Sequence, residues 1–182
     1  MPRVILAAVV AAALSYSCSP QNPRQDVRLF PVGADGKAGY VDSAGTLVIK
    51  LQFDDAMEFS EGFAAVSVGN KWGYIDKTGA FVVSPQFDKA GPLSEALAAV
   101  AVADKLGFVD RTGHFVVPPR FRAPSFLSFI RFTEGLAAVP MSEKWGYIDR
   151  GGRVVIDSQY DFARAFHEGI SAPWRAEESG AL

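Results

Sequence analysis

Apolar and polar positions alternate in short segments along this chain, and the order of the segments repeats. In one copy, an apolar run from Phe63 to Val68 is followed by the turn signal Gly69-Asn70 and by an alternating stretch from Lys71 to Asp76. A second turn at Asp76 to Gly79 leads to the apolar run Phe81 to Ser84. Such runs separated by turn residues predict three short strands of one antiparallel sheet.

The same unit occurs four times, and each copy carries a glycine, an aromatic residue, an aliphatic residue and an aspartate in series. The intervals between the four glycines are 34, 34 and 39 residues. A fixed period of this length is typical of stacked repeats. The longer interval adds its residues between Phe121 and Glu134, which lengthens one connection and leaves the other positions aligned. The four tetrads are Gly39-Tyr40-Val41-Asp42, Gly73-Tyr74-Ile75-Asp76, Gly107-Phe108-Val109-Asp110 and Gly146-Tyr147-Ile148-Asp149.

Acidic residues recur at two positions of the unit, and both are expected to be structural. The aspartate of each tetrad opens a four-residue turn that ends in glycine, where its carboxylate accepts backbone N–H groups. The spacing of a calcium loop is absent. A second acidic position precedes the first strand, and its four repeated copies do not form the single asymmetric constellation that catalysis needs. We expect these glutamates to bond backbone groups; they are Glu61, Glu95, Glu134 and Glu168.

A longer connection joins each unit to the next and carries a large apolar residue that is expected to plug the space between units. Because this connection returns the chain across the sheet, every unit starts in the same direction. The sequence therefore predicts an all-β fold of stacked three-stranded antiparallel sheets, arranged as an open array or a propeller-like arc. A turn of helix is expected near Ala56 or Ala163. The plugging residues are Phe59, Leu93, Phe132 and Phe166.

Two copies contain a Lys-Trp-Gly-Tyr-Ile-Asp stretch, at Lys71 to Asp76 and at Lys144 to Asp149. These residues resemble the signature of the WG-repeat family of bacterial proteins. The other two copies have Ala38 and Leu106 in place of the tryptophan. The resemblance covers residues 27–172. It implies a β-rich binding or scaffolding array and brings no catalytic residue set with it.

The N-terminus has the features of an export signal. A basic start at Arg3 precedes an apolar run from Val4 to Leu14, and small residues follow before Cys18. This pattern is typical of a secretory signal peptide, and the run is shorter than the ~20 residues that a membrane-spanning helix needs. We therefore divide the chain into a signal peptide at 1–17, a tether at 18–26, a WG-repeat domain at 27–172 and an irregular tail at 173–182.

Cys18 is the only cysteine, so the chain has no intramolecular disulfide. Its place directly after the signal resembles the lipid-modified cysteine of bacterial lipoproteins, although Leu14 stands one residue further away than in the usual box. Ordinary signal cleavage before Cys18 is the alternative, since Ser15 and Ser17 satisfy its small-residue rule. Acylation would anchor the protein in the membrane, at the periplasmic side or at the cell surface.

Charge and composition remove several classes of function. The formal net charge is −2 and no basic patch stands out, so nucleic acid is not an expected partner. His114 and His167 lie at unrelated positions of the repeat and have no further ligand at metal spacing. The sequence has neither a glycine-rich phosphate loop nor a nucleophile elbow. We therefore expect no enzyme, no cofactor and no metal.

The aromatic positions are the remaining candidates for ligand binding. The tryptophan position alternates between large and small residues, which favours partial exposure, because a core site tolerates such loss of volume poorly. Compensation by neighbouring side chains is the alternative. We expect a non-catalytic binding or scaffold module of the cell envelope with a protein partner, or alternatively a module that binds carbohydrate or peptidoglycan through exposed aromatic rows. The candidates are Trp72, Trp145, Tyr40, Tyr74, Phe108 and Tyr147.

Lipid anchoring predicts a defined difference between the natural chain and a Cys18→Ser variant. The natural chain is expected to gain the mass of its acyl chains and to fractionate with membranes, and the variant is expected to lose both properties. Intact mass spectrometry and fractionation measure this. An unmodified, soluble product that starts at Cys18 would show ordinary signal cleavage instead.

Overall fold

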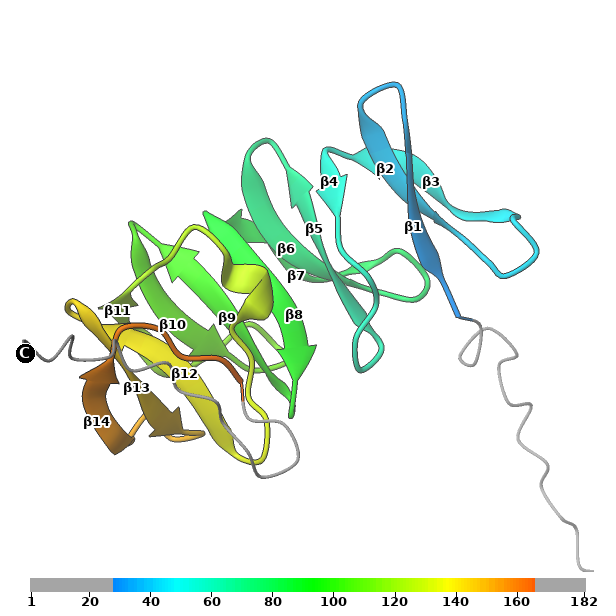
Figure 1. The fold of residues 1–182 in the computed structure, drawn as a ribbon. Coiled ribbons are helices and arrows are strands. Elements are labelled where there is room, and N and C mark those ends of the chain that lie inside the picture. Colours follow the sequence, from blue (N-terminus) through cyan, green and yellow to red (C-terminus); the bar gives the residue numbers. More distant parts are fainter. Residues whose placement is uncertain (1–27, 166–182) are drawn as a thin grey trace, which may run out of the picture.

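The computed structural model describes residues 28–165, which form four antiparallel sheets that follow one another along the chain (Figure 1). The sheets succeed each other in an open series, so the predicted stacked all-β repeat is confirmed and the array does not close. We number the units by their sheets. Unit 1 contains β1 (Phe30–Ala34), β2 (Lys37–Val41) and β3 (Leu47–Phe53); unit 2 contains β4 (Asp55–Ala56), β5 (Phe63–Val68), β6 (Lys71–Asp76) and β7 (Phe81–Phe87); unit 3 contains β8 (Lys89–Ser94), β9 (Leu97–Val102), β10 (Lys105–Val109) and β11 (Phe115–Arg122); unit 4 contains β12 (Leu136–Met141), β13 (Lys144–Asp149) and β14 (Val154–Tyr160).

Units 2 and 3 have a fourth strand that the sequence did not predict. The short strand β4 pairs with β5, and β8 pairs with β9, so that part of each connection adds to the edge of the next sheet. The expected helical turn near Ala56 is wrong, because Ala56 belongs to β4, and residues near Ala163 are not helical either. Within the described chain, the one helical segment is the 3₁₀ turn η1 (Leu127–Phe129), which lies in the lengthened connection.

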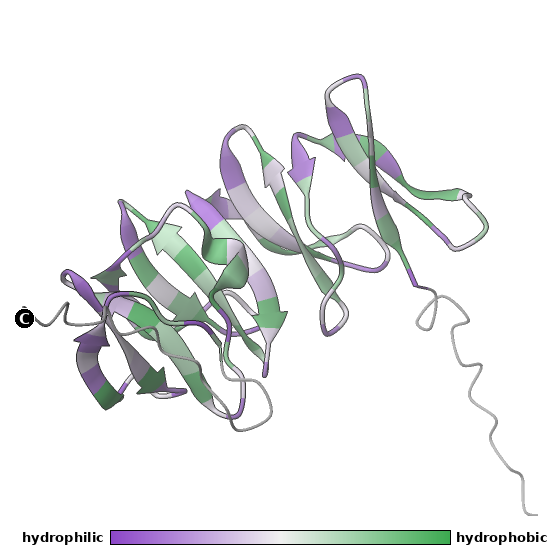
Figure 2. Cartoon of the chain, in the orientation of Figure 1, coloured by the Kyte–Doolittle hydropathy of each residue, from purple (hydrophilic) through white to green (hydrophobic). Residues whose placement is uncertain are grey.

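The hydrophobic core consists of layers between successive sheets. On β6, Ile75 faces unit 1 and packs with Tyr40 and Phe53, whereas Tyr74 faces unit 3 and packs with Val100. Both faces of an inner sheet are therefore buried, as expected of a repeat that contacts only its neighbours. In Figure 2 hydrophobic residues line the strands, and hydrophilic residues gather mostly at turns and strand ends.

The glycine of each tetrad is required by a close approach of backbone. In unit 2 the pairing of β6 with β7 is irregular between Trp72 and Ile75, and the bulged third strand crosses close to Gly73. A Cβ atom on Gly73 would lie 2.5 Å from the carbonyl oxygen of Val83. The glycines at the same position of the other units meet equivalent carbonyls at 2.5 to 2.7 Å.

The Asp-Gly turns have the predicted chemistry. A carboxylate oxygen of Asp76 accepts the backbone N–H groups of Thr78 at 2.8 Å and Ala80 at 3.1 Å, while Gly79 has a φ of +87°. Burial by itself would raise the pKa of Asp76, but hydrogen bonds from the Thr78 hydroxyl and the turn N–H groups hold this pKa below its ordinary value. The same turn occurs at Asp42, Asp110 and Asp149.

The close approach at Gly73 predicts a large loss of stability in Gly73→Ala. The added methyl group collides with backbone that cannot rotate away, so we expect a loss of about 3 kcal/mol in the free energy of unfolding, at the upper end of overpacking effects. Gly33→Ala is the matched control, because its Cβ would have only the Lys37 carbonyl at 3.7 Å and its φ is not positive. Denaturant unfolding measures both variants, and equal stabilities would contradict the assignment.

Candidate functional site

In three of the four tetrads, a tyrosine ties the following connection to its own sheet. The buried hydroxyl of Tyr74 donates to the Gly91 carbonyl at 2.9 Å, and that of Tyr40 donates to the Met57 carbonyl at 2.7 Å. Tyr147 makes the equivalent bond. Burial raises the pKa of Tyr74 above its ordinary value, so the hydroxyl keeps the proton that it donates.

An ion pair repeats beside this tie. Lys37 contacts Asp54 at 2.7 Å, and the other carboxylate oxygen of Asp54 accepts the N–H of Gly69 at 2.7 Å. The Lys37 hydrogen bond and then the Gly69 N–H hold the pKa of Asp54 below its ordinary value. The pairs of Lys71 with Asp88 and of Lys144 with Asp161 repeat the contact. Each aspartate thus sits where a connection begins.

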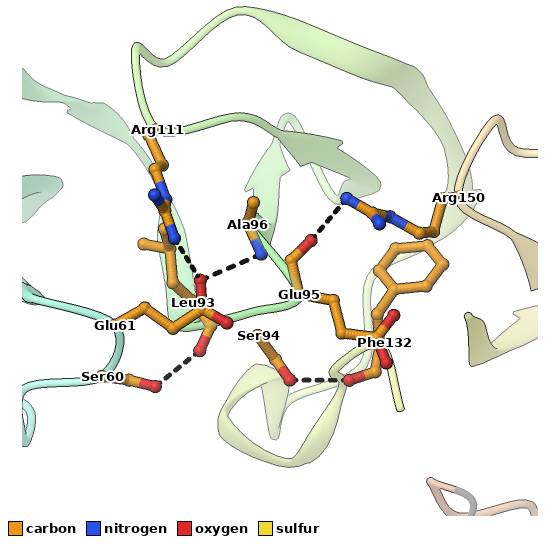
Figure 3. Close-up of polar contacts among 9 residues, drawn as sticks. All are labelled: Ser60, Glu61, Leu93, Ser94, Glu95, Ala96, Arg111, Phe132 and Arg150. Carbon is orange, nitrogen blue, oxygen red and sulfur yellow. Dashed lines mark hydrogen bonds and ion pairs between the residues drawn. The ribbon is translucent and has the colours of Figure 1, made fainter. Parts of the chain in front are cut away.

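The recurring glutamates join one unit to the next (Figure 3). Glu61 accepts the backbone N–H of Ala96 at 3.0 Å and contacts Arg111 at 2.9 Å. Although burial by itself would raise the pKa of Glu61, these hydrogen bonds hold it below its ordinary value. Glu95 accepts the N–H of Gly135 at 3.0 Å. The predicted backbone role is confirmed for these two glutamates, and their partners lie in the following unit.

Serine hydroxyls complete the same junctions. Ser60 donates to the Leu93 carbonyl at 2.7 Å, and Ser94 donates to the Phe132 carbonyl at 2.6 Å (Figure 3). Leu93 and Phe132 are buried, in agreement with their predicted place as plugs between units. Glu168 and Phe166 lie outside the described residues.

The junction between units 3 and 4 lacks several of these ties. The tetrad aromatic is Phe108, which has no hydroxyl, and the residue opposite Lys105 is Arg122, which carries the same charge as lysine and has no hydrogen-bond acceptor. Phe108 still packs edge-on against Phe132, with 4.8 Å between ring centroids, as Tyr40 packs against Phe59 in the first repeat. The connection that follows contains the inserted residues and forms η1 instead of a fourth strand.

β12 carries a proline at a position that faces the fourth strand in unit 3. In unit 3 the carbonyl of Ala101 accepts the N–H of Asp88 at 2.9 Å, so this residue turns its backbone groups toward the connection. Pro140 holds the corresponding position on β12, paired with Trp145 on β13. Proline has no N–H to donate and is confined to sheet edges. The outer side of β12 is an edge among the described strands.

A cavity of about 780 Å³ lies beside this edge. Phe126 of the inserted segment stacks on Trp145 with ring centroids 6.3 Å apart and planes 8° apart, and Phe162 meets Trp145 edge-on at 5.5 Å. Trp145 is only 9% exposed, whereas Phe129 is 68% exposed. We call this cavity the junction pocket. Its lining consists of Ser94, Phe126, Phe129, Ile130, Arg131, Thr133, Ala138, Trp145, Phe162, Ala163, Arg164 and Ala165.

Two guanidinium groups give the junction pocket its charge. Arg131 is exposed, and no hydrogen bond or ion pair of its side chain is found with any residue of 28–165. Arg164 lies over the ring of Phe162, with 5.7 Å between its guanidinium carbon and the ring centroid. The lining residues described above include no carboxylate. The pocket is therefore apolar inside and positively charged at its border.

The aromatic candidates from the sequence separate into two groups. The side chains of Tyr40, Tyr74, Phe108 and Tyr147 are at most 2% exposed, so the expectation that this position forms an exposed row is wrong. The cause for Tyr40, Tyr74 and Phe108 is that they face the core layer shared with the following sheet. The connection after β14 covers Tyr147, whose hydroxyl donates to the Arg164 carbonyl.

The two tryptophans differ from each other. Trp72 is half-buried against the core between units 2 and 3, whereas Trp145 lines the junction pocket. Leu106 fills the same position with a fully buried side chain, which agrees with compensation by neighbours. His114 belongs to the turn of unit 3, where it contacts the Thr112 hydroxyl. Cys18 and His167 lie outside the described residues.

Sequence reasoning missed Phe126, Phe129, Arg131, Phe162 and Arg164 as lining residues. A usable signal existed. The insertion coincides with Phe108 at a tyrosine position and Arg122 at an aspartate position, and both substitutions remove a tie of the connection.

Within residues 28–165, no group of three or more His, Cys, Asp or Glu side chains is placed to hold a metal ion. The same part of the chain contains no helix long and apolar enough to span a membrane.

The geometry defines a repeat array of small stacked sheets, and comparison with known families identifies it. The model of the WG containing repeat matches residues 39–72, 72–105, 107–145 and 145–172. These matches cover most of the chain, which therefore belongs to the WG containing repeat family. No curated protein matches it at a significant level.

The tyrosine ties predict opposite effects of one hydroxyl at two equivalent positions. Tyr74→Phe leaves the buried Gly91 carbonyl without its donor and should cost about 1–2 kcal/mol of unfolding free energy. Phe108→Tyr places a polar hydroxyl among the fully buried side chains around Phe108, where the connection is built differently around η1, and should also destabilise. Denaturant unfolding tests both, and a stabilised Phe108→Tyr variant would disprove the account of the third junction.

Proposed function

We propose that this chain is a non-catalytic binding module of the bacterial cell envelope that engages a protein partner through the junction pocket. One observation carries the proposal. The pocket forms where two of the recurring ties are missing, and there it presents aromatic side chains and two guanidinium groups that have no carboxylate partner within residues 28–165. Aromatic and arginine side chains are the residues that contribute most at protein interfaces.

The distribution of aromatic residues favours a protein over a glycan. A row of exposed rings along the array would suit a polysaccharide, but five of the six candidates are buried. Trp72 and Trp145 belong to different core layers and do not form one platform. Of the other exposed rings, Phe126, Phe129 and Phe162 gather at a single pocket, whereas Phe30, Phe81 and Phe115 lie at the starts of separate strands.

The repeated carboxylates support a non-catalytic role. Asp76 and its counterparts hold turns, Asp54 and Asp88 hold connections, and Glu61 and Glu95 hold junctions. Each carboxylate is already engaged by N–H groups of the fold, which leaves none of them poised for proton transfer.

The envelope location rests on the N-terminal sequence. Export by residues 1–17 and acylation of Cys18 would hold the array at the membrane through the short tether at 18–26. The array would then meet other envelope proteins at high local concentration.

Site-specific photocrosslinking in the producing cell tests the proposed function. A photoreactive phenylalanine analogue replaces Phe129, which is 68% exposed at the pocket, and in a control it replaces Val102, which is 37% exposed on β9 and does not line the pocket. We expect one discrete protein adduct from position 129 and none from position 102.

Retention of the protein on cell-wall polysaccharide without a protein adduct would support the glycan alternative instead. Turnover of a hydrolase substrate by the purified chain would contradict a non-catalytic role. The adduct, if formed, also yields the partner for identification by mass spectrometry.

A further inference from the structure

We infer that the junction pocket binds an extended acidic peptide segment of the partner, with a bulky apolar side chain inserted between Phe126, Phe129 and Phe162 and a neighbouring carboxylate paired with Arg131 and Arg164. This inference rests on the proposed function and specifies the chemistry of the partner. Three features of the pocket support it independently.

The first feature is the shape of the apolar lining. Phe126 meets Phe129 at 6.4 Å and Phe162 at 6.3 Å, and Phe126 also covers Trp145, so four rings form a connected aromatic wall. Phe126, Phe129 and Phe162 all remain more than a third exposed. An inserted apolar side chain would remove these rings from water, which is the main source of favourable free energy in binding.

The second feature is charge. A guanidinium group pairs with a carboxylate through two parallel hydrogen bonds, and such pairs are stronger than neutral hydrogen bonds. Arg111 and Arg150 show the contrast within this chain, because the first is engaged by Glu61 and the second by the Glu95 carbonyl. Arg131 and Arg164 have no such acceptor within 28–165, although the chain as a whole is acidic.

The third feature is the edge of β12. In unit 2 the carbonyl of Ala65 accepts the N–H of Met57 at 2.9 Å, which ties the connection to β5. Ala138 holds the position of Ala65 and lines the junction pocket, and no described residue replaces Met57 there. A peptide that extends a sheet edge gains affinity from main-chain bonds and specificity from pockets for its side chains.

Binding of defined peptides to the purified Cys18→Ser chain, which carries no acyl groups, tests the inference. The probe is an acetylated, amidated Gly-Asp-Phe-Asp-Gly peptide. Its neutral counterpart has Asn in place of Asp, and a second counterpart has Ala in place of Phe. Isothermal titration gives affinities, and the three tryptophan indole N–H signals in NMR spectra report the location.

We expect the acidic aromatic probe to bind at least about tenfold more tightly than either counterpart, the scale of one charge-assisted pair. The Trp145 indole signal should move and the Trp72 signal should not. The double variant Arg131→Gln, Arg164→Gln should lose this preference. Arg153→Gln, an exposed arginine that does not line the pocket, should keep it.

Three results would overturn the inference. Equal affinity for the acidic and neutral peptides would rule out pairing of a peptide carboxylate with the two arginines. An unchanged Trp145 signal would place binding elsewhere. Movement of the Trp145 signal on deletion of residues 173–182, with no peptide present, would make the chain's own tail the occupant. A protein crosslink from position 129 would support the proposed function whatever the peptides show. Failure of this inference is therefore distinct from failure of the proposed function.

Discussion

Close face-to-face packing of successive sheets is the constraint on which the structure depends. The side chains on both faces of an inner sheet must be short enough for its neighbours to pack closely. In unit 2 the small residues of β5 meet this need. Ala64 and Ala65 point to opposite faces of β5, and both are 1% exposed. The tetrad glycine meets the same need within the sheet, because the third strand passes where its Cβ would stand. Larger residues at these positions would separate the layers and leave voids that close-packed protein interiors do not contain.

The ties around each connection follow from that packing. The core layer between two sheets is shielded from water only if the connection between them lies along their edge. The tyrosine hydroxyl, the Lys-Asp pair and the Glu contact hold the connection there. At the third junction the Glu95 contact remains, while Phe108 and Arg122 replace two of the other tying residues. Packing of Phe126 on Trp145 takes their place. The junction pocket is the result of exchanging directional bonds for aromatic contacts.

Much of the fold was predictable because its signals are local. The predicted strands Phe63 to Val68 and Lys71 to Asp76 have the observed bounds, since alternation and turn residues determine them. The exposure of the Tyr74 position was predicted wrongly, because one strand's pattern does not show that a second sheet covers its other face. The strand β4 was missed because Asp55–Ala56 is too short to carry a pattern. The pocket was missed because it joins Phe126, Trp145 and Phe162, which only the tertiary structure brings together.

The insertion leaves the internal spacing of the following unit unchanged. In units 1, 2 and 4 the paired lysine and aspartate are 17 residues apart, and so are the tyrosine and its carbonyl acceptor. The unit after the longer connection therefore has the same internal spacing as the units before it. Since each sheet contacts only its neighbours, the mechanical cost of added residues is confined to one boundary. In an array of this kind, one connection can be lengthened and a cavity can form at that boundary while the packing of the remaining layers is retained.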